Sequence, residues 1–238
     1  GGGLGGVSPR LPFWVAAGLT LLNAMYGLFV LPESLSPERR KAFAWGRANP
    51  MGSLVLLRSH RELLGLATVN FLYYVAHHVL PSVFVLYTGY RYGWDETTVG
   101  LTLAGVGICN IAVQGLLVKP IVASFGERRA LLAGLFFGAA GFAVYGLAAT
   151  GAGFWLGVPV FAFMGLFGPA TQGLMTRRVG PSEQGQLQGA NSSLMGLSGL
   201  IGPGLFTLTF ASFIGTRADW HQPGAPFLLA ALLLTAAL

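Results

Sequence analysis

The sequence predicts an all-α integral membrane protein with about six full transmembrane helices and a truncated seventh. Hydrophobic residues make up 53% of the 238 residues, charged residues make up only 9%, and the mean hydropathy is +0.64. A soluble domain carries about 25% charged residues, so a soluble enzyme of this composition could not cover its surface. The apolar residues also fall in long runs without the period-two alternation of a β-barrel, which favours membrane-spanning helices.

The predicted spans are apolar runs separated by polar joints. A helix needs about 20 apolar residues to cross the hydrocarbon core. Six runs reach that length, at 11–32, 63–87, 97–118, 130–150, 154–176 and 185–214, and a shorter run covers 226–238. The short last run, and a glycine-rich start (GGGLGGV) that resembles the end of a preceding helix, predict a fragment of a longer membrane protein.

Basic residues gather on alternate joints. Eleven of the 14 lysines and arginines lie in 33–62, 119–129 and 177–184. Cytoplasmic loops carry the excess of Lys and Arg, so these joints are assigned to the cytoplasm, and the net charge of +6 needs no nucleic-acid partner. The long joint 33–62 is read as a cytoplasmic central linker between two helix groups. Aromatic residues near the outer joints predict an interfacial belt: Tyr87, Tyr90, Tyr92, Trp94, Trp155 and Trp220.

Uncharged polar side chains lie inside the predicted spans, whereas all eight acidic residues lie in joints or at span ends. Such groups at lipid depth face the bundle interior or a wet cavity, and a histidine can carry a proton near neutral pH. The alternative is a structural role as hydrogen-bonding groups between helices. The candidates for a substrate cavity or for proton coupling are Asn70, Tyr74, His77, His78, Asn110, Gln114, Gln172 and Asn191.

Small residues predict close helix packing in two spans. Gly134 and Gly138 form a GxxxG motif, and a longer stripe in the sixth span recurs every three or four residues. That stripe is Gly185, Gly189, Ser192, Gly196, Gly199 and Pro203. Motifs for other chemistry are missing from the sequence: it has no P-loop, GxSxG or HExxH. The single cysteine, Cys109, excludes an intrachain disulfide and a Cys-based zinc site, and no metal site is expected.

Five short motifs carry a family resemblance. They are YGW with VGLTLAGVG at 92–107, ASFGERR at 123–129, GPATQGLM at 168–175, QGQLQG at 184–189 and IGPGLF at 201–206. Together they resemble the major facilitator superfamily, and within it the tetracycline and multidrug proton antiporter group. The resemblance implies a twelve-helix transporter with two six-helix halves that alternate in access around a midplane site.

The resemblance also implies a division of the chain. Residues 1–32 would hold the last transmembrane helix of the N-terminal half with the tail of the preceding helix. Residues 33–62 would be the linker between halves, and residues 63–238 the C-terminal six-helix bundle with its last helix truncated. The loop that resembles the family's cytoplasmic gate contains Gly115, Gly126, Arg128 and Arg129. The two arginines are expected to pair with helix ends or acids of a neighbouring helix, or else only to anchor the loop in the cytoplasm.

One departure from the resemblance concerns proton coupling. Tetracycline antiporters carry a histidine in helix 8 and a membrane-embedded acid in helix 9, and the matching positions here are Asn110 and Gly138. Tetracycline specificity is therefore open, and coupling would use the missing half, His77 or His78, or another group.

The function that these observations predict is proton-coupled efflux of small amphipathic drugs, tetracycline-like or multidrug, across the inner (plasma) membrane. The driving force would be the proton gradient, with no cofactor. The expected partners are the lipid bilayer, a small-molecule substrate and the missing N-terminal half. One alternative is uptake of a nutrient such as a sugar or peptide on the same scaffold. Another is a membrane-embedded enzyme that uses His77 or His78, although no acid or nucleophile pair accompanies them at that depth.

Overall fold

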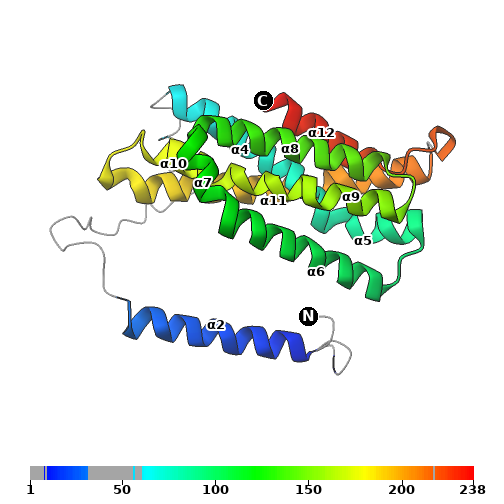
Figure 1. Ribbon diagram of the computed structural model, residues 1–238, viewed down its shortest axis with the longest axis horizontal. Helices are drawn as coiled ribbons and strands as arrows, with labels where there is room; N and C mark the ends of the chain where they lie inside the picture. The colour runs from blue at the N-terminus through cyan, green and yellow to red at the C-terminus, as the bar shows by residue number, and fades with distance from the viewer. Residues whose placement is uncertain (1–7, 9, 32–55, 57–60, 217) are drawn as a thin grey trace. The chain divides into compact units, whose positions relative to one another are not determined.

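The computed structural model describes residues 8, 10–31, 56, 61–216 and 218–238, and the chain divides into two units, 1–42 and 43–238 (Figure 1). In unit 1 the described helix is α2 (Leu11–Phe29), and none of its residues is buried. The predicted helix tail at 1–7, and the predicted linker 33–62 apart from Leu56 and the start of α4, lie outside the described residues. The three-part division of the chain therefore stays a prediction.

Unit 2 is a helical bundle, and no strand occurs in the described ranges of the chain. Its first elements are α4 (Arg61–His77), α5 (Val79–Tyr92), α6 (Glu96–Ala112), the π-helical turn η2 (Val113–Leu117), α7 (Val118–Phe125) and α8 (Glu127–Leu147). They are followed by α9 (Gly151–Ala162), the 3-10 turn η3 (Phe163–Leu166), α10 (Phe167–Thr176), η4 (Pro181–Glu183), α11 (Gln184–Ile214), η5 (Ala218–Trp220) and α12 (Ala225–Ala236).

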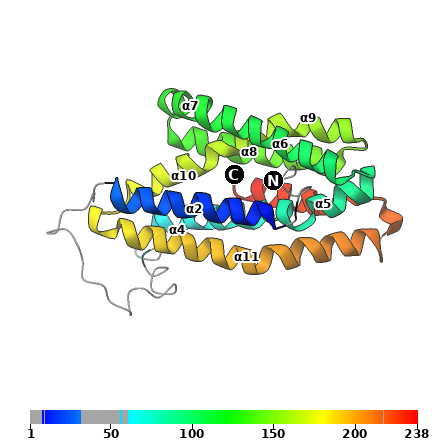
Figure 2. The ribbon, with the colours of Figure 1, turned by 90° about the horizontal axis from the view of Figure 1, so that it is seen from below.

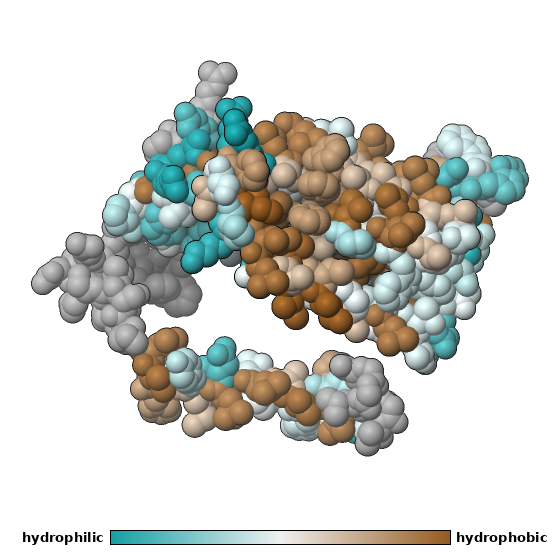
Figure 3. Space-filling view, viewed as in Figure 1, coloured by the Kyte–Doolittle hydropathy of each residue, from teal (hydrophilic) through white to brown (hydrophobic). Residues whose placement is uncertain are grey.

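These elements confirm the predicted fold class. Counting α2, the described residues form 6 helical segments that are long and apolar enough to cross a membrane, and α12 is a shorter apolar helix. Hydrophobic residues cover the middle of the visible face of unit 2, and hydrophilic residues lie towards its two ends (Figure 3). Large side chains such as Leu200, 82% exposed, and Ile111, 74% exposed, lie on the outside of the helices. That distribution suits lipid as the surrounding solvent.

Several helices extend beyond their predicted ends because polar residues continue them. The second span reaches Tyr92 and ends at Gly93, whose φ of 66° caps α5 in the left-handed region. The third span reaches Phe125 and ends at Gly126. The sixth span is one helix, α11, and it contains Pro203.

Helix α8 packs against α9, α10 and α12. Its glycines let these neighbours approach. A Cβ added at Gly134 would lie 2.7 Å from the backbone nitrogen of Phe167, and one at Gly138 would lie 2.9 Å from Leu234 Cδ1. The packing role predicted for this GxxxG motif is confirmed.

The longer stripe in α11 is not the buried face of that helix, although α11 does run along α4 and α5 (Figure 2). A Cβ added at Gly185 or Gly196 would meet no atom within 4 Å, and Ser192 is exposed. Within the described bundle no neighbouring helix packs closely against Gly185 or Gly196, and the packing role of the stripe stays a prediction. The other members, Gly189, Gly199 and Pro203, are half-buried. The buried residues of α11 are Leu187, Ala190, Asn191, Ser198, Gly202, Phe206 and Phe210.

The expected aromatic belt is only partly present. Tyr90 and Trp220 are exposed as a belt requires. Tyr87 instead is fully buried, and its hydroxyl donates to the Tyr145 carbonyl at 2.9 Å. The Tyr92 hydroxyl likewise donates to the Ala148 carbonyl at 2.9 Å. These hydrogen bonds fix the end of α8 to α5 inside the bundle. A buried hydroxyl requires a hydrogen-bond partner, and here backbone carbonyls provide it in place of the membrane interface.

Candidate functional site

A polar cavity of about 240 Å³ lies between α4, α10 and α11. Its described lining consists of Asn70, Tyr73, Tyr74, Phe167, Gly168, Thr171, Gln172, Gln188, Asn191, Ser192 and Met195. These side chains are amides, hydroxyls, aromatic rings and a thioether, and none of them is ionisable near neutral pH. The cavity can therefore orient a ligand through hydrogen bonds and ring contacts rather than through ion pairs.

Two of the spans that form this cavity contain helix interruptions. Proline has no N–H, so Pro81 cannot donate to the carbonyl of His77, four residues before it, and α4 ends at His77. In the fifth span, Pro169 likewise cannot donate to the carbonyl of Gly165, which lies in the 3-10 turn η3 before α10. Irregular backbone at membrane depth is tolerated where it lines a cavity or is buried in protein, and it is typical of transporter binding sites.

The cavity wall combines an amide pair with an aromatic stack. The Asn70 Nδ2 donates to Asn191 Oδ1 at 3.1 Å, and this bond joins α4 to α11 across buried residues. The Tyr73 ring stacks on the Phe167 ring, with centroids 4.0 Å apart and planes 13° apart. Each contact joins two helices, so the lining side chains are held in place by their neighbours.

Half of the predicted cavity residues meet here. Asn70, Tyr74, Gln172 and Asn191 line the cavity. The residues that sequence reasoning did not assign to it include Tyr73, Phe167, Thr171 and Met195. The only sequence signal for them is position, because Tyr73, Thr171 and Met195 lie within four residues of a predicted polar candidate and Phe167 lies five residues from one.

The two histidines lie in different surroundings. His77 is exposed and stacks on Tyr73, with ring centroids 6.0 Å apart, so it lies beside the cavity. His78 packs against α11 instead: a Cβ added at Gly202 would lie 2.6 Å from His78 Cβ, and one at Gly199 would lie 3.6 Å from Nε2.

Asn110 and Gln114 do not line this cavity. Gln114 lies in the π-helical turn η2, and a Cβ added at Gly165 would lie 3.3 Å from Gln114 Cγ. Gln114 therefore lies against η3 rather than against α4 and α11. A spacing of four residues predicts that two side chains lie on one face of a helix, but it does not predict which neighbouring helix packs against that face.

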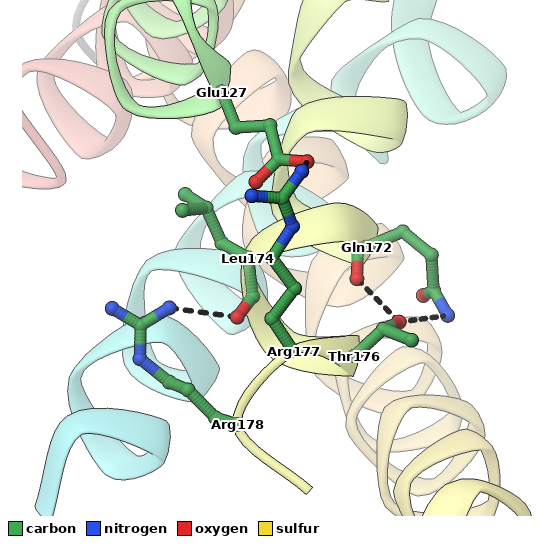
Figure 4. Close-up of polar contacts among 6 residues, drawn as sticks. All are labelled: Glu127, Gln172, Leu174, Thr176, Arg177 and Arg178. Carbon is green, nitrogen blue, oxygen red and sulfur yellow. Dashed lines mark hydrogen bonds and ion pairs between the residues drawn. The ribbon is translucent and has the colours of Figure 1, made fainter. Parts of the chain in front are cut away.

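Two ion pairs join three helices at the end of the bundle where the described basic joints meet, and Figure 4 shows Arg177, Arg178 and Glu127 there. Arg177 Nη2 lies 2.9 Å from Glu127 Oε1, whose side chain is only 14% exposed. Arg178 Nε lies 2.7 Å from Glu62 Oε2, and its Nη1 donates to the Leu174 carbonyl at 2.7 Å. These contacts fix the end of α10 to the starts of α8 and α4.

The predicted gate loop supplies the turn for this cluster. Gly126 has φ 80° and ψ 162°, a conformation that is essentially restricted to glycine. Gly115 lies in η2 in open space. Arg128 and Arg129 are exposed, and neither forms an ion pair with a described residue. The expected pairing with a neighbouring helix is made by Glu127 instead, because successive residues at a helix start point in different directions.

Comparisons with known proteins agree with this architecture. The sequence matches the Major Facilitator Superfamily over residues 1–203 and, in an overlapping second match, over residues 66–238. It is 33% identical over 223 residues to the tetracycline resistance protein, class C, of Escherichia coli, covering 91% of this chain and 54% of that protein. It is 30% identical over 226 residues to the class G protein of Vibrio anguillarum, covering 92% and 56%.

A mammalian relative is similar over the same length. The chain is 28% identical over 240 residues to hippocampus abundant transcript-like protein 1 of Rattus norvegicus, covering 92% of this chain and 47% of that protein. The chain thus spans about half the length of the relatives it matches. Since the family match extends over nearly the whole sequence and the membrane-length helices agree with it, the chain belongs to the Major Facilitator Superfamily.

Proposed function

We propose that this chain is the C-terminal part of a secondary active transporter that exports small amphipathic drugs, tetracycline-like or multidrug, in exchange for protons. The observation that carries the proposal is the uncharged polar cavity between α4, α10 and α11, which presents amides and an aromatic stack to one ligand. The names of two relatives, both tetracycline resistance proteins, support export of a drug.

The charge cluster suits a mechanism in which each half moves as a body. Alternating access in such folds is largely rigid-body rocking of one repeat against another around a fixed site. The Glu127–Arg177 and Glu62–Arg178 pairs join helices within unit 2, so they would keep the ends of α4, α8 and α10 together during that motion. The missing N-terminal half would supply the opposite wall of the path, with residues 33–62 as the linker between the two halves.

For proton coupling, His77 is the better placed of the two histidines because it stacks on Tyr73 at the cavity wall. Gly138, which matches the position of the antiporter acid, has little space around it: an added Cβ would lie 2.9 Å from both Leu234 Cδ1 and Met164 Cγ. An acid there would be pressed into packed helices, so coupling through another group is favoured. His77→Gln should uncouple export from the proton gradient, whereas His78→Gln should not.

The test uses the full-length open reading frame expressed in a drug-sensitive bacterium. Cells that express the protein should accumulate less of a fluorescent tetracycline than control cells, and a protonophore should abolish the difference. Gln188→Leu, a change in the cavity wall, should raise accumulation, whereas Gln222→Leu, in the exposed outer joint, should not. Unchanged accumulation over a broad drug panel would refute export. Fractionation should find the protein in the inner membrane.

A further inference from the structure

The hydroxyl of Thr171 lacks a partner inside the protein. Thr171 lies in α10, lines the cavity and is only 3% exposed. Of the buried side-chain nitrogen and oxygen atoms in the described part of the chain, its Oγ1 alone makes no hydrogen bond. Buried polar groups are almost always paired, and an exception in a native structure calls for an explanation.

Other threonines of the bundle show the usual solution. In helices, a threonine hydroxyl commonly donates to the carbonyl four residues earlier. Thr88 donates to the Phe84 carbonyl at 3.0 Å, and Thr102 donates to the Thr98 carbonyl at 2.8 Å. Thr176, five residues beyond Thr171 in the same helix, donates to the Gln172 carbonyl at 2.6 Å. The free hydroxyl of Thr171 is therefore particular to the cavity wall rather than general to the bundle.

The cavity restricts what that hydroxyl could bind. A cavity of about 150 Å³ holds benzene, so about 240 Å³ suits a compound of two fused rings. The Tyr73 and Phe167 rings give such a compound an aromatic contact, since offset and edge-on ring arrangements are favourable. The described lining has no carboxylate to balance a cation and no basic group to balance an anion. A charged ligand would therefore find no counter-charge on the walls that α4, α10 and α11 supply, and an unpaired charge away from water is unfavourable.

We propose that this cavity recognises an uncharged planar ring compound and that the Thr171 hydroxyl selects it by a hydrogen bond to a polar group on the ring edge. A threonine in a helix divides between two χ1 rotamers, so the hydroxyl can turn towards a ligand at the cavity wall. Gln172 and Asn191 flank the same space with amide groups. The proposal rests on the proposed function in that it takes this cavity as the substrate site.

The binding test uses three probes with one ring system: naphthol, naphthalene and the cation naphthylmethylammonium. Each is titrated against the full-length protein in lipid nanodiscs, and empty nanodiscs correct for partition into lipid. Naphthol should bind about tenfold more tightly than naphthalene, as expected for one well-formed hydrogen bond, and more tightly than the cation. Thr171→Val should lower naphthol affinity about tenfold and leave naphthalene unchanged, whereas Thr171→Ser should keep naphthol affinity near wild type.

A stability measurement separates ligand recognition from a structural role. Thr171→Val removes an unpaired hydroxyl, so the apparent Tm of the ligand-free protein should stay the same or rise. The matched control, Thr88→Val, removes a hydroxyl that is already paired, and it should lower the apparent Tm without changing naphthol affinity. If Thr171→Val lowers the apparent Tm as Thr88→Val does, the hydroxyl is structural and the proposal is overturned.

The outcomes also separate this proposal from drug export. If Thr171→Val binds naphthol like wild type, or if the cation binds as tightly as naphthol, recognition through Thr171 is overturned even where cells still export drugs. If expressing cells export nothing but naphthol binding depends on Thr171 as described, export is overturned and the recognition proposal is supported.

Discussion

Gly141→Ala tests the close approach of α8 and α9. A Cβ at Gly141 would lie 2.7 Å from Phe161 Cβ and 2.8 Å from Phe161 Cα. Carbon atoms rest at about 3.5–4.0 Å, so the two helices would have to separate by about 1 Å. Overpacking of this kind costs about 1–3 kcal/mol, and replacing a helical glycine by alanine returns about 1 kcal/mol. We expect a net loss of about 1 kcal/mol of stability.

Gly138→Ala is the matched control, because both glycines are buried in α8 and gain the same helix propensity. Its nearest atoms all belong to flexible side chains, Leu234 Cδ1 and Met164 Cγ at 2.9 Å and Met164 Sδ at 3.0 Å, whereas those at Gly141 include the Phe161 backbone. The assay heats purified full-length protein in detergent and measures the fraction that stays monodisperse. Gly141→Ala should lose that fraction at a lower temperature than Gly138→Ala. Equal curves would refute the reasoning that backbone contact limits the approach of these helices.

Three further predictions concern polar and loop positions. Gly126→Ala should lower the stability of the folded protein by about 1–3 kcal/mol, because the backbone conformation of Gly126 is essentially restricted to glycine. Lower expression and slower drug export in cells would be the measured effects. Arg177→Gln should slow export because it leaves the largely buried Glu127 carboxylate unpaired, and adding Glu127→Gln should recover part of the rate in a double-mutant cycle. The Thr98 hydroxyl and backbone N–H hold the pKa of Asp95 below its ordinary value. The Asp95 cap therefore stabilises α6 fully at pH values above the ordinary pKa of an aspartate, and this stabilisation is lost as the pH falls through the lowered pKa of the folded protein. At neutral pH, hydrogen exchange in the first turn of α6 should therefore be slower in the wild-type protein than in Asp95→Ala. In acid, the two proteins should exchange at the same rate.

The sequence was sufficient for the fold class because lipid imposes one requirement on every span. Uncharged runs of about 20 residues have to be helices, and all six long runs became membrane-length helices. The span ends were less accurate, since residues such as Arg91 and Lys119 continue a helix beyond the hydrocarbon. The family is one of transporters, so the alternative of a membrane-embedded enzyme is wrong.

The site was predicted only in part, because the spacing of polar residues predicts which of them share one face of a helix but does not predict which other helix packs against that face. Asn70 and Asn191 were selected as separate polar residues, and the structure joins them in one hydrogen bond. Gln114 has the same character, but it lies against Gly165 of η3 and does not line this cavity. The free hydroxyl of Thr171 had no sequence signal at all, because most threonines in membrane helices satisfy themselves locally.

The ion pair between Glu62 and Arg178 has a consequence for synthesis of the chain, because its partners are 116 residues apart. At about 5–20 residues per second, the ribosome would deliver the arginine roughly 6–23 s after the glutamate. Until then the start of α4 has no electrostatic anchor on α10. We expect nascent chains stalled before Arg178 to be cut there by a protease, and longer nascent chains to be protected.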